Sequence, residues 1–94
     1  MTDMEISEVV TRILRDRFNQ FGFAGARVRS DIDFDGTPII RVTGSYENGR
    51  VPTRRLIDTL DAIRSELIDR GEDRIVFLDS EYPGVPWEED DVED

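Results

Sequence analysis

The sequence contains no cysteine, histidine or lysine. The first two absences exclude disulfides, thiol chemistry, Cys/His zinc sites and every mechanism that uses imidazole. A catalyst built from this chain would depend on carboxylates, hydroxyls, arginine or tyrosine, and no such group has a recognisable catalytic spacing. We therefore expect a protein that is not an enzyme and that uses no cofactor.

Long apolar runs are also missing, because none approaches the roughly 20 residues that a membrane-spanning helix needs. The first ten residues, MTDMEISEVV, lack the basic and apolar regions of a signal peptide. These two absences predict a cytoplasmic protein that makes no contact with a membrane.

Acidic residues dominate the charge, with 22 acids against 12 bases and a net charge of −10. A high-GC genome, a proteome adapted to high salt, and mimicry of nucleic acid by carboxylates are three explanations of this acidity. Binding to nucleic acid across a broad surface is disfavoured by the same charge. Six of the acids lie in the tail EEDDVED, residues 88–94, which is typical of a solvated terminal run.

Apolar periodicity predicts helices at residues 3–21 and 53–70, and strands at 26–34, 38–46 and 74–79. Thr2 and Glu5 have the spacing of a capping box, Thr53 is a candidate N-cap, and Gly22 and Gly71 mark helix ends.

The order α-β-β-α-β predicts an α+β two-layer sandwich, with both helices on one face of a three-stranded sheet. The third strand should lie parallel to a strand of the hairpin, but its neighbour stays open. We assign residues 1–79 to one domain and residues 80–94 to an extended, proline-containing segment with an acidic tail.

The stretch DIDFDGTPIIRV, residues 31–42, resembles the start of a calcium-binding loop. Asp31, Asp33, Asp35 and Gly36 match its first ligand positions, but Val42 stands where a bidentate Glu is required. The exiting residues have the pattern of a strand rather than a helix, so we predict a β-hairpin and no metal site.

The apolar pattern of this hairpin requires a connecting loop of odd length, with Gly36 in the left-handed conformation. Only then do the apolar sets of the two strands share one face. That face should turn toward the helices and carry Ile32, Phe34, Ile40 and Val42.

An exposed apolar strip is expected on the opposite face of the sheet. Ile39 lies there, together with one of the pairs Ile75/Phe77 and Val76/Leu78. The segment EYPGVPW either folds back over this strip or serves as a linear docking motif with aromatic anchors. The candidate partner-binding residues are Ile39, Arg41, Tyr82, Val85 and Trp87.

These features predict a small protein–protein interaction module without catalytic activity: an accessory subunit, a regulator or an immunity-type inhibitor. Its partner is another protein or a second copy of itself. The alternative is a module that binds an anionic ligand, such as a nucleotide or phosphate, through Arg50, Arg54 and Arg55 at the start of the second helix. The α-β-β-α order is similar to that of RNA-binding KH domains, but their GxxG loop is absent, and topology alone does not give function.

Overall fold

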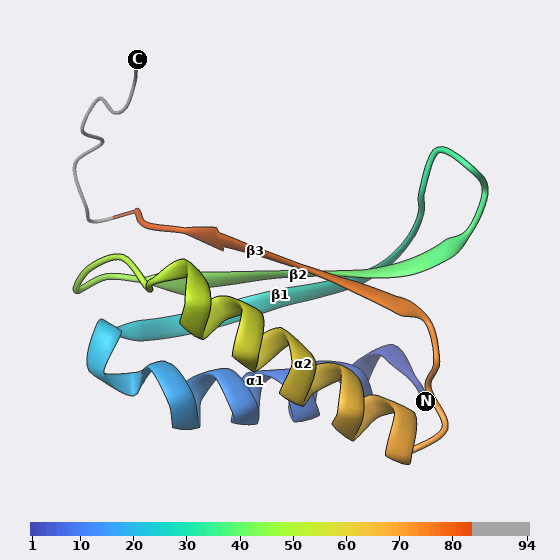
Figure 1. Cartoon of the computed structure of the whole chain (residues 1–94), viewed down its shortest axis with the longest axis horizontal. Coiled ribbons are helices and arrows are strands. Elements are labelled where there is room, and N and C mark those ends of the chain that lie inside the picture. Colours follow the sequence, from blue (N-terminus) through green and yellow to red (C-terminus); the bar gives the residue numbers. More distant parts are fainter. Residues whose placement is uncertain (84–94) are drawn as a thin grey trace.

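The fold is an α+β sandwich in which two helices pack on one face of a three-stranded mixed sheet (Figure 1). The computed structural model describes residues 1–83. Its elements are α1 (Asp3–Phe18), the 3₁₀ helix η1 (Asn19–Phe21), β1 (Phe23–Ile32), β2 (Pro38–Tyr46), α2 (Thr53–Asp69) and β3 (Ile75–Glu81). This order and the placement of both helices confirm the predicted fold class. Val85, Trp87 and the acidic tail lie outside the described residues.

The ends of α1 follow from its sequence. The Thr2 hydroxyl accepts a hydrogen bond from the backbone N–H of Glu5, and the Glu5 carboxylate accepts one from the N–H of Thr2. This reciprocal capping box confirms the predicted helix start. The α-helix ends at Phe18 rather than at residue 21, because the last turn tightens into η1 before Gly22 redirects the chain with a φ of 73°.

The start of α2 differs from the prediction that Thr53 is its N-cap. Pro52 occupies the N-cap position with a φ of −59° and a ψ of 142°, and no side chain caps the helix there. The proline ring fixes φ, and the extended ψ of Pro52 places Thr53 inside the helix as its first residue. The helix runs to Asp69, and Gly71 follows it with a φ of 92°, as expected at a helix end.

The central strand of the sheet is β2, which pairs antiparallel with β1 and parallel with β3. The predicted parallel placement of the third strand is therefore confirmed, and its neighbour is the second strand of the hairpin. Ile40 and Val42 of β2 and Val76 of β3 point toward the helices and join the core. The helices contribute most of the remaining core side chains, which include Ile6, Val9, Val10, Leu14, Phe18, Ile63 and Leu67.

The hairpin loop has an odd number of residues, as predicted, but Ile32 and Phe34 do not face the helices as predicted. Ile32 pairs with Pro38, which leaves a five-residue connection, and Gly36 adopts a φ of 85°. Ile32 is 62% exposed and Phe34 is 98% exposed. Figure 1 shows the reason, because the hairpin continues past the helical layer and bends away from it. Phe34 also lies beyond the end of β1, so strand alternation no longer sets its direction.

The outer face of the sheet, opposite the helices, carries Ile75 and Phe77, which are 46% and 41% exposed. Val76 and Leu78 form the pair that points inward. Ile39 lies on the outer face by alternation, but it is fully buried and therefore does not extend the exposed strip as predicted. It belongs to the central strand, where it is opposite Asp31 on one side and Ile75 on the other.

Candidate functional site

Exposed apolar side chains gather at the end of the sheet where β1 finishes and β3 begins. We call this region the hairpin end and define it by Ile32, Phe34, Pro38, Arg74, Ile75 and Phe77. In the register, Ile32 is opposite Pro38, and the next residue, Ile39, is opposite Ile75. Strand alternation places Ile32 and Pro38 on the helix side of the sheet and Ile75 and Phe77 on its outer face, so the hairpin end includes both faces. Exposed apolar side chains that gather at one end of a sheet are candidate contact points for a partner.

The most exposed of these side chains, Phe34, stands on an ordered turn. The Asp33 carboxylate accepts hydrogen bonds from the backbone N–H groups of Asp35, at 2.8 Å, and Thr37, at 3.1 Å. Two backbone bonds, from Asp33 to Thr37 and from Gly36 to Asp33, close the same loop. The turn therefore holds the aromatic ring outward in one backbone conformation, which lowers the entropy cost of binding.

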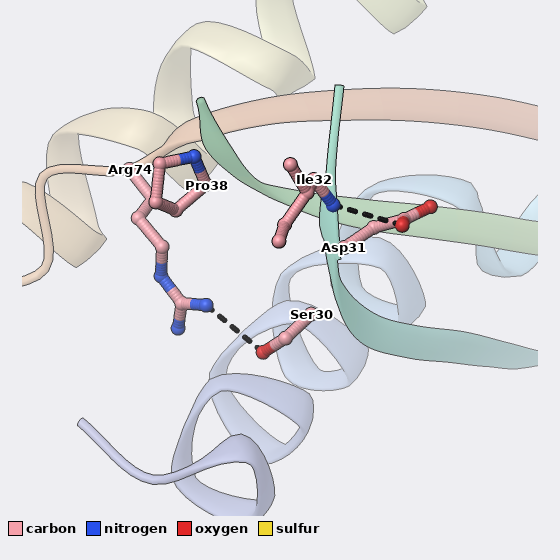
Figure 2. A pocket seen from close by; sticks show the side chains of 5 residues that line it. All are labelled: Ser30, Asp31, Ile32, Pro38 and Arg74. Atoms are coloured by element: carbon pink, nitrogen blue, oxygen red, sulfur yellow. Dashed lines mark hydrogen bonds between the residues drawn. The ribbon is translucent and has the colours of Figure 1, made fainter. Parts of the chain in front are cut away.

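An open hollow of about 460 Å³ lies below the hairpin and is lined by Ser30, Asp31, Ile32, Pro38 and Arg74 (Figure 2). The Arg74 guanidinium donates to the Ser30 hydroxyl at 2.9 Å and to the Glu72 carboxylate at 2.8 Å. These bonds from Arg74 hold the pKa of the Glu72 carboxyl below its usual value. Since Arg74 is already engaged by a carboxylate, the hollow offers Ile32 and Pro38 as apolar surface rather than an anion site.

On the outer face, Arg41 of the central strand β2 contacts residues of both β1 and β3. Its Nε donates to the Asp31 carboxylate at 2.8 Å, and its guanidinium lies 5.6 Å from the centre of the Phe77 ring. The N–H of Ile32 and the Arg41 guanidinium lower the pKa of the Asp31 carboxyl. Arg41 therefore presents a half-buried, oriented guanidinium beside an exposed aromatic ring, in agreement with its predicted place on this face.

The other end of the outer face is polar. Glu81 accepts a hydrogen bond from Ser45 at 2.7 Å and two from the Arg27 guanidinium at 3.1 and 3.2 Å. The Ser45 and Arg27 bonds lower the pKa of the Glu81 carboxyl. The exposed apolar side chains Ile75 and Phe77 thus lie at the β3 start, and a hydrogen-bonded charge pair lies at the other end of this face.

Tyr82, predicted to be a partner-binding residue, lies in the core instead of on an accessible strip. It is 8% exposed, its hydroxyl accepts a hydrogen bond from the N–H of Val51, and its ring lies 5.8 Å from that of Tyr46. Burial is the largest cause that raises the pKa of Tyr46, to about 12. β3 continues to Glu81, so Tyr82 follows directly from the strand and packs inward.

Two of the three arginines proposed for an anion site contact aromatic rings. Arg50 lies 5.1 Å from the Tyr82 ring centre. Arg55 lies 5.4 Å from the ring of Phe21 and donates to the backbone carbonyl of Arg17. Arg54 is exposed on the first turn of α2. The anionic-ligand alternative stays a prediction.

Sequence reasoning missed Ile32 and Phe34 as surface residues. The signal was present, because an aspartate at position 33 followed by Asp35 and Gly36 is typical of a side-chain-stabilised turn. Such a turn ends the strand at Ile32 and places Phe34 in the loop.

The aspartates that resemble a calcium loop are used by the hairpin itself. Asp31 pairs with Arg41, and Asp33 accepts from the turn backbone. Within residues 1–83, no group of three or more histidines, cysteines, aspartates or glutamates is arranged to hold a metal ion. In the same part of the chain, no helix combines the length and apolarity needed to cross a membrane.

Comparison with known proteins found no matching family model, no matching curated protein and no matching solved structure.

Proposed function

We propose that the chain is a small protein–protein interaction module without catalytic activity, which docks on its partner through the hairpin end and the adjoining outer face of the sheet. The observation that carries the proposal is Phe34, an almost fully exposed aromatic ring on a turn fixed by Asp33. Aromatic and arginine side chains dominate the binding energy of protein interfaces. A rigid turn that presents such a ring is an anchor ready to enter a pocket on another protein.

The outer face supports the proposal through its neighbouring groups. Ile75 and Phe77 add exposed apolar area, and Arg41 lies against Phe77 with its charge paired to Asp31. A charge that is already paired costs less to cover than an unpaired one. An apolar centre surrounded by oriented polar groups is typical of protein–protein interfaces.

Charge defines the class of partner. The hairpin loop carries Asp33 and Asp35 on either side of Phe34, and the whole chain has a net charge of −10. The partner surface should therefore combine an apolar pocket with arginine or lysine side chains on its border, since complementary potentials steer association and reject wrong partners. An accessory subunit, a regulator and an immunity-type inhibitor all fit this description.

Site-specific crosslinking tests the proposal. Phe34 is replaced by the photoreactive residue p-benzoylphenylalanine, and the chain is irradiated in the cells that naturally produce it. A matched variant carries the same residue in place of Arg17, which is exposed on α1 and outside the hairpin end. We expect a discrete adduct from position 34, identified by mass spectrometry as another protein or a second copy, and none from position 17. No adduct at position 34, or the same adducts at both, would contradict the proposal.

A further inference from the structure

The two outer strands of the sheet differ in how their free edges are protected. β1 carries the charged residues Arg27, Arg29 and Asp31, and a bulge near its start shifts its register with β2. Charges and bulges keep an exposed edge from pairing with another strand. β3 begins with the apolar run IVFL, residues 75–78, contains no proline or lysine, and pairs with β2 without a shift. Its other edge pairs with no strand among residues 1–83, so this edge is open to an additional strand.

The backbone of β3 directs hydrogen-bonding groups toward this open edge. The N–H of Asp33 donates to the carbonyl of Thr37, which fixes the odd-numbered residues of β2 as those that bond to β1. The even-numbered residues of β2 therefore bond to β3. In a parallel pair they bond to the residues on either side of their partners, which are the odd-numbered residues of β3. The even-numbered residues, among them Val76 and Leu78, therefore point their N–H and C=O groups away from β2.

Beside this edge, α2 leaves room for a second chain. A groove of about 190 Å³ separates the helix from the strand and is lined by Thr53, Leu56, Ile57, Leu60 and Leu78. Leu78 points toward the helices but is only half-buried, so α2 does not close over the edge of β3. The groove and the open edge together form one continuous surface.

The side of α2 that borders the groove lies opposite the side that contacts α1. On the α1 side, Glu66 lies 3.9 Å from the Arg12 guanidinium, and Arg55 donates to the backbone carbonyl of Arg17. At 3.6 residues per turn, four exposed residues lie about half a turn away from these contacts. We call them the outer stripe: Ile57, Asp61, Arg64 and Ile68.

The outer stripe is self-complementary. When two copies of α2 lie antiparallel, Ile57 of one faces Ile68 of the other, and Asp61 of each faces Arg64 of the other. Ile57 and Ile68 are 55% and 60% exposed, and neither Asp61 nor Arg64 forms an ion pair with another residue among 1–83. A two-fold symmetric interface uses the same patch of both subunits and so requires a surface that matches itself. The outer stripe meets this requirement in both charge and apolar contact.

We propose that the chain forms a two-fold symmetric dimer, in which β3 pairs antiparallel with β3 of the second copy and the two outer stripes pack together. The axis passes between Asp61 and Arg64 on the helix. Figure 1 shows the middle of α2 beneath the middle of β3, so the same axis meets the strand near Phe77. Val76 then lies opposite Leu78 of the second copy, apolar beside apolar. The two sheets become one sheet of six strands.

The dimer does not rest on the proposed function. Pairing along the β3 edge leaves the outer face of the sheet open, and Phe34 lies on a loop beyond β1, which is the other edge strand. Phe34→Ala should therefore leave the dimer intact, whichever way the crosslinking experiment turns out.

Charge reversal tests the dimer, with sedimentation equilibrium of the full-length chain as the measurement. We expect the native chain to be a dimer at micromolar concentration. Asp61→Arg places two arginines opposite each other at both symmetric contacts, and Arg64→Asp places two acids there. Because both pairs change sign together, each variant should raise the dissociation constant about tenfold or more. Asp58→Arg, the same charge change at an exposed position of α2 outside the outer stripe, should leave it unchanged.

Mixing the two weakened variants gives the sharpest result. The arginines of the Asp61→Arg chain then face the acids of the Arg64→Asp chain, so an equimolar mixture should recover a dimer nearly as stable as the native one. Circular dichroism of each variant alone confirms that it is folded. A monomeric native chain, single variants that dimerise like the native chain, or a mixture that fails to associate would each overturn the proposal.

Amide hydrogen exchange tests the strand pairing itself. The N–H groups of Val76 and Leu78 should exchange at least several-fold more slowly in the native dimer than in the Asp61→Arg chain. The N–H of Phe77 bonds to β2 and should be protected in both. Fast exchange of Val76 and Leu78 in the native chain would show that the strands do not pair. Equal protection in the monomeric variant would show that the chain covers its own edge, and either result would overturn the proposed interface.

Discussion

The two ends of the β1–β2 hairpin use their aromatic side chains in opposite ways. At the end near η1, which we call the closed end, five rings pack together with centroids 5.7–6.0 Å apart. They belong to Phe18, Phe21, Phe23, Tyr46 and Tyr82. At the hairpin end, Phe34 makes no such contact within the described residues and is 98% exposed. The rings of the closed end are therefore part of the core, whereas the Phe34 ring buries almost no area among residues 1–83.

The largest loss in the free energy of unfolding should follow from removing the central aromatic ring of the closed end. Tyr46 is fully buried and its ring contacts those of Phe18, Phe23 and Tyr82. Replacing a buried aromatic residue by alanine costs about 3–5 kcal/mol, because it removes contacts and leaves a cavity. Urea unfolding of Tyr46→Ala measures this loss. A loss below about 1 kcal/mol would show that the closed end does not hold the fold together, since surface changes have effects of that size.

A substitution at Gly44, at the same end, should cause a smaller loss of stability. A Cβ at Gly44 would clash with the Tyr46 hydroxyl oxygen, so Gly44→Ala forces the ring to move. Overpacking of this kind costs about 1–3 kcal/mol in the free energy of unfolding. The same substitution in a Tyr46→Phe background should cost less, because the closest atom is removed. Equal costs in both backgrounds would mean that the clash with Tyr46 is not the cause.

At the hairpin end, Asp33→Ala should have a modest effect on stability. It removes two hydrogen bonds to the turn backbone, which we expect to lower the free energy of unfolding by about 1 kcal/mol. The larger consequence should be on the turn itself, which no longer fixes the direction of Phe34. Amide hydrogen exchange of Asp35 and Thr37 measures the opening of the turn. Asp35→Ala, which removes a carboxylate without such bonds, is the control and should leave both amides protected.

Acid should weaken the contact between Glu72 and Arg74 beside the hairpin end. The bonds from Arg74 lower the pKa of Glu72 in the folded chain, so the folded state binds this proton less readily than the unfolded state. The stabilisation is therefore complete above the ordinary glutamate pKa of 4.5 and is lost as the pH falls below it through the lower folded value. Comparing the pH dependence of unfolding for the native chain and Glu72→Gln isolates this contribution. Identical pH profiles would contradict it.

The sequence predicted the parts of the fold that depend on local chemistry and periodicity. The capping box at Thr2 and Glu5, the bounds of β2 and the inward direction of Ile40 and Val42 all agree with the structure. Each of these features is set by residues within a few positions of one another. The end of the first helix was less accurate, because turn geometry at η1 overrides periodicity there, and Pro52 rather than Thr53 is the N-cap of α2.

The errors concern properties that depend on neighbours distant in sequence. Ile39 is buried because β1 and β3 flank it, and that strand order cannot be derived from alternation. Tyr82 lies in the core because β3 extends to Glu81 and brings the ring beside Tyr46. Arg55 packs over rings of α1 and η1, which no pattern around residue 55 indicates. The exposure of Phe34 was the one error that turn chemistry in the local sequence could have prevented.

The central claim is that Phe34 serves binding and not folding. The measurement that tests it is the affinity of the crosslinked partner for Phe34→Ala, alongside the free energy of unfolding of the same variant. We predict that affinity falls by about 2 kcal/mol, roughly 30-fold, as for an interface hot spot, while stability changes by less than about 0.5 kcal/mol. Unchanged affinity, or a loss of stability that accounts for the weaker binding, would contradict the account.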